Sequence, residues 1–112
     1  MTVANKRFKS GIQLGTSETN IITGAANTVS RVDSLVFTNT SAGTVLVTVY
    51  FYASGDAAAD DTTLVKAKSL SANESWICSE AINQRLDNAA ILSALSDTAT
   101  AVTVACSGVE IS

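Results

Sequence analysis

The sequence predicts an all-β protein that folds as a single antiparallel β-sandwich, of either jelly-roll or immunoglobulin-like type, with about eight short strands. Three observations support this prediction. Apolar and polar residues alternate with a period of two in several segments, as in strands with one buried face. β-Branched and aromatic residues are concentrated in the same segments. Glycines and polar turns separate these segments at short, regular intervals, which is typical of sandwiches.

The chain is predicted to be one domain over residues 1–112, because this length is usual for a single domain and no low-complexity linker divides it. Its basic residues are unevenly placed: three of the seven, Lys6, Arg7 and Lys9, fall within the first nine positions. The rest of the chain carries four basic and ten acidic residues, a net charge of −6. We therefore expect residues 1–7 to form a flexible basic arm, and the three basic residues to contact an acidic neighbour.

Four segments organise the first half of the chain. Residues 7–14 alternate between apolar and polar side chains and predict a strand. Residues 19–23 predict a short second strand, which ends at a glycine. Residues 29–40 predict a third, whose interrupted alternation indicates either a bulge or burial on both faces. The polar connection 39–43 then predicts a hairpin to the following strand.

The run 44–52 is β-branched and aromatic throughout, and it predicts a central strand covered on both faces, one by the core and one by another subunit. Its two tyrosines, Tyr50 and Tyr52, are predicted to be interface aromatics if the intervening residues face the core. Those intervening residues are Val45, Val47, Val49 and Phe51. The opposite orientation of the strand is also compatible with the pattern.

Residues 63–68 predict an edge strand, because two lysines discourage pairing with another chain. The segment after it fits a helix and a strand about equally well. We predict a short turn or one helical turn near 82–86 and a strand at 90–95, because an Asp-Asn turn signal lies between them. The last strand is predicted at 101–105, followed by 106–108 and 109–111, and the change of alternation after Gly108 indicates a bulge.

No catalytic centre is evident in the sequence. The chain has no histidine, which removes the commonest general base, and no glycine-rich phosphate-binding loop. The acidic residues in loops show no spacing that singles out a catalytic pair or a metal site: Asp56, Asp60, Asp61, Glu74, Glu80 and Asp87. We therefore expect no enzyme activity, no metal and no cofactor. Two alternatives stay open, a calcium ion on the 56–61 loop and a sugar-binding platform that uses Trp76 with Tyr50 or Tyr52.

The two cysteines, Cys78 and Cys106, are expected to be reduced and buried, or disulfide-bonded if their strands are neighbours. No apolar run is long enough to span a membrane, and the first residues do not resemble a signal peptide, so no membrane contact is expected. The net charge of −3 argues against nucleic acid as the main partner.

Several blocks of the sequence resemble small structural proteins that tailed bacteriophages encode among their morphogenesis genes. In order, these blocks are Ile22-Thr23-Gly24-Ala25, Ser34-Leu35-Val36-Phe37-Thr38-Asn39-Thr40-Ser41, Val45-Leu46-Val47-Thr48-Val49-Tyr50, Leu70-Ser71-Ala72-Asn73-Glu74-Ser75 and Ala101-Val102-Thr103-Val104-Ala105-Cys106-Ser107-Gly108-Val109-Glu110-Ile111. The chain departs from that pattern at residues 25–27, where such proteins usually have a proline.

The resemblance implies a head decoration or cement protein, made in the bacterial host cytoplasm and bound to the outer capsid surface of the virion. Its implied partners are the major capsid protein and copies of itself, in a trimer or a dimer. Low charge fits this role, since serine and threonine make up 28 of the 112 residues and charged residues only 15%. The alternatives are a neck, tail or fibre-associated virion protein and a carbohydrate-binding module.

Overall fold

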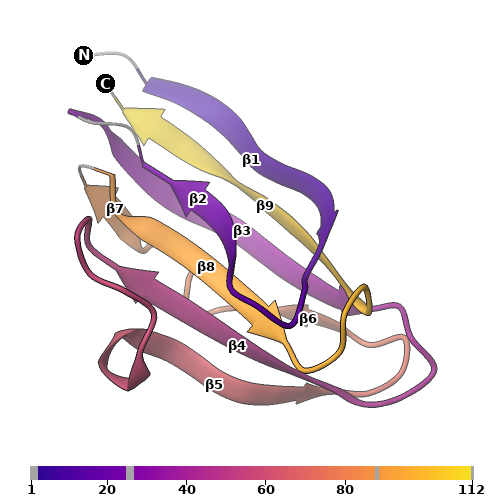
Figure 1. Ribbon diagram of the computed structural model, residues 1–112. Coiled ribbons are helices and arrows are strands. Elements are labelled where there is room, and N and C mark those ends of the chain that lie inside the picture. Colours follow the sequence, from indigo (N-terminus) through magenta and orange to yellow (C-terminus); the bar gives the residue numbers. More distant parts are fainter. Residues whose placement is uncertain (1–2, 25–26, 88, 112) are drawn as a thin grey trace.

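The computed structural model describes residues 3–24, 27–87 and 89–111, and these form two antiparallel sheets packed face to face (Figure 1). The predicted fold class, an all-β antiparallel sandwich, is confirmed. The described residues contain nine strands and one short 3₁₀ helix. Three of the strands are ten or eleven residues long, so the strands are more numerous and longer than the eight short ones expected.

Sheet A contains five strands in the order β1, β9, β3 and β6, with β7 also paired to β3. Their bounds are β1 Val3–Gln13, β3 Val29–Asn39, β6 Ser75–Ile77, β7 Arg85–Asp87 and β9 Val102–Ile111. Sheet B contains four strands in the order β2, β8, β4 and β5. Their bounds are β2 Thr19–Thr23, β4 Val45–Tyr52, β5 Thr63–Leu70 and β8 Ile91–Ser96, with the 3₁₀ helix at Asp60–Thr62.

The strand order is that of a jelly roll. The first strand pairs with the last (β1 with β9), the second with the one before it (β2 with β8), and β4 with β5. The remaining partner of β3 is divided into β6 and β7, which pair with opposite ends of that strand. This nested antiparallel pairing, split between two sheets, distinguishes a jelly roll from an immunoglobulin-like sandwich.

The flexible basic arm expected over residues 1–7 is not observed where the structure describes them. Residues 3–7 are part of β1, paired with β9 from Val3 opposite Ile111 onward; residues 1–2 lie outside the described range. Two bulges interrupt this pairing, and Gly11 takes a left-handed φ of 86° at the second. The apolar residues of β1 fix it to the sandwich, because Phe8 and Ile12 pack against the core.

The connection 39–43 does not close a hairpin. β3 belongs to sheet A and β4 to sheet B, so the chain crosses between the layers here. Buried Asn39 makes this crossing possible: its Nδ2 donates to the carbonyl oxygens of Gly43, Leu70 and Ser71 at 2.7, 3.0 and 3.1 Å. Its Oδ1 accepts from the backbone N–H and the hydroxyl of Ser41. One side chain thus ties the end of sheet A to the start of β4 and the end of β5.

The prediction of a central strand at 44–52 and an edge strand at 63–68 is confirmed. β4 lies between β8 and β5, and β5 is the last strand of sheet B. The register of β5 shifts twice against β4, and Ala67 has a left-handed φ of 53° in this region. Bulges of this kind, together with Lys66 and Lys68, make an edge a poor template for pairing.

Of the short turn or single helical turn expected near 82–86, the structure shows short turns, which begin earlier. Their hydrogen bonds span residues 78–84, for example from the Ala81 N–H to the Cys78 carbonyl oxygen, and the chain then enters β7. The strand at 85–87 was not expected, because three residues are too few for a period of two to be recognised. The strand expected at 90–95 is confirmed as β8.

The bulge expected in the 29–40 strand is confirmed by a register shift between Val32 and Ser34. The bulge expected after Gly108 is not in β9. Every residue of β9 from Ser107 to Ile111 has a partner in β1, and the extra residues lie in the neighbouring strands, between Arg7 and Lys9 and between Val32 and Ser34. Gly108 is paired with Lys6 of β1 and Val32 of β3, and a Cβ atom built on it would lie 1.9 Å from the carbonyl oxygen of Arg31.

Candidate partner-binding surfaces

Lys6 lies in β1 on the same side of the strand as Phe8, and its side chain is half-exposed. Its Nζ is 3.1 Å from Oε2 of Glu110 and 6.0 Å from the centre of the Phe8 ring. A half-exposed ion pair of this kind contributes at most about 1 kcal/mol of stability. Beside it, a shallow cavity of about 280 Å³ opens between β1 and β2, lined by Lys6, Phe8, Asn20, Ile21, Ile22, Thr23 and Glu110.

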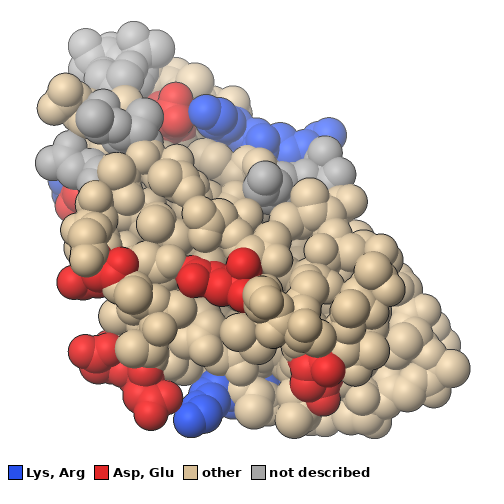
Figure 2. Space-filling view, viewed as in Figure 1, with Lys and Arg blue, Asp and Glu red and all other residues tan. Residues whose placement is uncertain are grey.

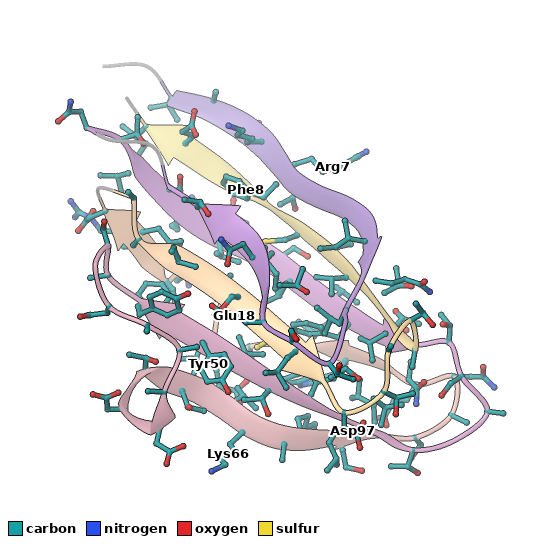
Figure 3. The ribbon with its side chains drawn as sticks, in the orientation of Figure 1. Arg7, Phe8, Glu18, Tyr50, Lys66 and Asp97 are labelled. Atoms are coloured by element: carbon teal, nitrogen blue, oxygen red, sulfur yellow. The ribbon has the colours of Figure 1, made fainter. Side chains whose placement is uncertain are left out.

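Arg7 points away from the sandwich on the outer side of β1, opposite to Phe8 (Figure 3). The backbone of Lys9 pairs with Cys106, and its side chain lies outside the described part of the structure. The backbones of all three basic residues therefore belong to β1, the edge strand of sheet A. The acidic neighbour predicted for them stays a prediction, although Lys6 already has a carboxylate partner in its own chain.

Tyr50 and Tyr52 lie in β4 of the other sheet. Val45, Val47 and Val49 face the core, so the orientation that places the tyrosines on the outer side is the observed one. Tyr50 is half-buried, and Tyr52 is almost fully buried although it is on the outer side.

A hydrogen-bonded cluster covers Tyr52. Its hydroxyl donates to Oε2 of Glu18, and the hydroxyl of buried Ser93 donates to the same oxygen at 2.5 Å. Burial, and then the Glu18 carboxylate, raises the pKa of Tyr52. The phenol is therefore engaged within the chain. The five residues singled out from the sequence are divided between two sheets and do not form one site.

The outer face of sheet A carries an uncharged surface that the sequence analysis did not single out, and we call it the neutral patch. It consists of side chains from β3, β6 and β9 that alternate with buried neighbours: Ser34, Val36, Thr38, Ser75, Ile77, Thr103, Ala105 and Ser107. Ile77 is 61% exposed, which is unusual for an isoleucine. The alternation with buried Leu35 and Phe37 was the signal in the sequence that could have identified this face.

Two arginine–aspartate pairs lie at one end of the same face. Arg31 and Arg85 are directly opposite each other on β3 and β7. Each donates from Nε to the aspartate two residues further along its own strand, Arg31 to Asp33 at 3.1 Å and Arg85 to Asp87 at 2.7 Å. Like charges opposite each other on a sheet repel, and the aspartates offset that repulsion. Each bond uses one of five guanidinium donors, which leaves capacity for a partner.

Trp76 packs inside the sandwich edge. Its ring stacks on buried Phe37 with the centroids 5.3 Å apart, and the ammonium group of Lys68 lies 5.7 Å from its centre. Phe37 and Trp76 are paired across β3 and β6, whereas Lys68 comes from sheet B. Trp76 and Tyr52 therefore lie apart and are both covered within the chain, so they do not combine into a sugar-binding platform.

The acidic residues of the loops are dispersed. The ion pair between Lys66 and Asp60, at 3.5 Å, is highly exposed at both ends and adds little stability. Within residues 3–24, 27–87 and 89–111, no three side chains of the metal-binding types come together in a way that could hold a metal ion. A search of the same residues for a helix long and apolar enough to cross a membrane finds none.

Charge is distributed unevenly between strands and connections. All seven basic residues lie in strands: Lys6, Arg7, Lys9, Arg31, Lys66, Lys68 and Arg85. Seven of the ten acidic residues lie in connections: Glu18, Asp56, Asp60, Asp61, Glu74, Glu80 and Asp97. Figure 2 shows this pattern on the face formed by β2, β8 and β4, where acidic groups are scattered over an uncharged surface and basic groups follow the β1 edge.

Both cysteines are free and buried. The two residues flank Leu35, since Cys106 pairs with it from β9 and the Cys78 N–H donates to its carbonyl oxygen from the other side. Two strand spacings, about 10 Å, therefore separate their Cα atoms, whereas a disulfide requires less than about 7 Å. Burial raises the pKa of Cys78 to about 11 and that of Cys106 to about 12.

These raised pKa values predict a loss of stability in alkali. Between about pH 9, where thiols of the unfolded chain ionise, and the folded pKa values of about 11 and about 12, the folded state keeps protons that the unfolded state has lost. The free energy of unfolding should be steady near neutral pH and fall as the pH rises above about 9. Urea titrations across this range test it, and thiol reagents should label both cysteines only after denaturation. Rapid labelling of either native thiol would contradict the burial.

No protein-family model matches the sequence, and no curated protein matches it either. Among solved structures, a chain from the crystal structure of the T13 particle of infectious bursal disease virus is similar, with a TM-score of 0.56 and 12% identity. The similarity covers 98% of this protein and 30% of that chain. A chain from the structure of the Gx strain of the same virus has a TM-score of 0.49 and 16% identity, over 97% and 31%. At these identities the likeness shows a shared fold, and this protein spans about a third of the viral chain.

Proposed function

We propose that this protein is a non-catalytic structural component of a virus particle, namely a decoration or cement protein on the capsid of a tailed bacteriophage. The observation that carries the proposal is the jelly roll itself, which matches a chain of an icosahedral virus particle over nearly the whole length of this protein. Jelly rolls are common in viral capsid proteins, although they also occur in lectins and cupins. The resemblance of the sequence blocks to phage structural proteins supports the same class.

The surface supports a role in permanent contact with neighbours. The neutral patch offers hydroxyl groups and methyl groups, which can be buried with a small loss of hydration compared with charged groups. In the proposed role, the protein binds the major capsid protein on the outside of the shell, together with further copies of itself. Each copy buries a modest area, and many copies together hold neighbouring capsid subunits against the pressure of the packed genome.

The test uses particles of the virus that encodes the chain. Cryo-electron microscopy should show the jelly roll in many copies on the outer capsid surface, and particles lacking it should release their genome at a lower temperature. Adding the purified protein back should restore the release temperature. Equal stability with and without it would refute stabilisation, and a few copies at one vertex would place it at the neck, tail or fibre base instead.

A further inference from the structure

A cavity of about 370 Å³ opens on the outer side of sheet A, at the end where β3 pairs with β7. Arg31 lies between buried Ser30 and Val32 in β3, so its side chain leaves the sheet on the outer side. Arg85 precedes buried Leu86 in β7 and leaves the sheet on the same side. Five residues line the cavity: Val29, Arg31, Asn83, Arg85 and Ile111.

The two arginines of this cavity are held by carboxylates that lie outside it. Arg31 and Arg85 are directly opposite each other, and their Nε atoms donate to Asp33 and Asp87 at 3.1 and 2.7 Å. Neither aspartate is among the residues that line the cavity. Each guanidinium group keeps most of its five N–H donors after this bond. The aspartates therefore restrict the two guanidinium groups, while the cavity wall itself carries two cations.

The remaining lining residues add an apolar surface and an amide. Val29 and Ile111 are directly opposite each other on β3 and β9, two residues along the sheet from Arg31. Two residues of a strand span about 7 Å, so the apolar pair is separated from the arginines by about that length. Asn83 contributes its amide from the turn before β7, where its N–H donates to the Val32 carbonyl oxygen at 2.7 Å. The cavity thus has a cationic end and an apolar end.

We propose that this cavity binds an organic carboxylate, with the carboxylate group between the guanidinium groups of Arg31 and Arg85 and an apolar body on Val29 and Ile111. The planar fork of an arginine donates two parallel hydrogen bonds to a carboxylate. An anion between the two arginines also offsets the repulsion between like charges on neighbouring strands. The apolar body removes two half-buried side chains from water. The site belongs to the protein alone and does not depend on the role in a virus particle.

Two other cavities fit an anionic ligand less well. The cavity between β1 and β2 has Glu110 beside Lys6 in its wall, and a third cavity has Asp33 together with Arg7. A carboxylate in the wall repels an anion and offsets the attraction of the neighbouring cation. The described lining of the proposed site contains no carboxylate.

The test is a nuclear magnetic resonance titration of the complete chain that follows the Nε–Hε signals of Arg31 and Arg85. Hexanoate should shift both signals with a Kd of about 10 mM or less. Acetate and inorganic phosphate should bind at least about fivefold more weakly, because they lack the apolar body. Hexylamine, with the same apolar body and the opposite charge, should not bind. Absence of a shift with hexanoate would overturn the proposal, as would phosphate or hexylamine binding as tightly as hexanoate.

A carboxylate with an apolar body occurs both in small acids and at the C-terminus of a peptide. N-Acetylleucine represents the peptide terminus in the same titration. Tighter binding of N-acetylleucine than of hexanoate would assign the site to the end of a protein chain, and the reverse order would assign it to a small acid. Either order supports the proposal.

Substitutions test the role of the guanidinium groups, with the signal of Arg31 as the readout. Arg85→Gln should weaken hexanoate binding about tenfold. Arg85→Lys should weaken it as well, because lysine keeps the charge and loses the planar fork. The matched control, Lys66→Gln, removes one positive charge from β5 of sheet B and should bind hexanoate like the wild type. Circular dichroism should be the same for all three variants, because both positions are exposed. Unchanged binding in Arg85→Gln or in Arg85→Lys would refute recognition by the paired arginines.

Discussion

Replacing Gly108 with alanine is expected to lower the free energy of unfolding by about 3 kcal/mol or more. A Cβ atom on Gly108 would lie 1.9 Å from the carbonyl oxygen of Arg31 and 3.0 Å from Cε2 of Phe8. The phenyl ring can turn aside, but the oxygen belongs to the backbone of β3. Relief therefore requires β9 and β3 to move apart in the middle of sheet A, where Gly108 is paired with Val32 on one side and Lys6 on the other.

Thermal unfolding measures this effect. A loss of about 3 kcal/mol corresponds to a fall in Tm of about 12 °C or more in a domain of this size. The matched control is Gly43→Ala, because no atom lies within 4 Å of a Cβ built there. That variant should stay within about 0.5 kcal/mol of the wild type. A Gly108→Ala protein as stable as the control would show that β9 and β3 are not as close as the structure places them.

The sequence was most informative where one strand face is buried. The patterns in 29–40 and 101–111 predicted strands at these places, although the strands are longer than expected, and the β-branched run at 44–52 predicted the central strand of sheet B. The lysines of 63–68 correctly indicated an edge, because charge on a strand discourages further pairing. These features could be predicted from local patterns, because each depends only on which residues of a single segment are buried.

The sequence was least informative about which segments pair. A polar connection such as 39–43 looks the same whether it closes a hairpin or crosses between sheets, and the difference depends on the distant carbonyl groups of Leu70 and Ser71. The charge of the N-terminal cluster predicts a solvated arm, whereas the apolar Phe8 within it packs against the core. Only the pairing with β9, about a hundred residues away along the chain, makes that segment a strand.

The candidate partner-binding surfaces could be predicted only in part from the sequence. Residue type and alternation indicated Tyr50 and Tyr52 as interface aromatics. The contact of Tyr52 with Glu18, however, depends on a loop from another part of the chain. The neutral patch contains serine, threonine and alanine, which carry little signal one at a time. It becomes recognisable when three strands place these residues on one face, and the same is true of the opposed Arg31 and Arg85.

Replacing Asn39 with aspartate is expected to destabilise the protein by about 3 to 5 kcal/mol at neutral pH, although the two side chains have almost the same shape. The amide nitrogen donates to three carbonyl oxygens, of Gly43, Leu70 and Ser71, at 2.7 to 3.1 Å. A carboxylate oxygen in that position donates nothing and faces three partial negative charges inside a fully buried site. The connection between sheet A and sheet B would lose these three hydrogen bonds, so the two layers should separate more easily.

The effect of this substitution should depend on pH in a defined direction. Burial and the facing carbonyl oxygens raise the pKa of the new carboxyl group in the folded state above its unfolded value. The variant is therefore least impaired in acid, where a protonated carboxyl can still donate one hydrogen bond, and loses stability as the pH rises through the raised pKa. Urea titrations at several pH values measure this, with Asn5→Asp on the exposed outer side of β1 as the matched control. The control should lie within about 0.5 kcal/mol of the wild type at neutral pH. An Asn39→Asp penalty that grows in acid would mean that the amide does not hold the two sheets through its donors.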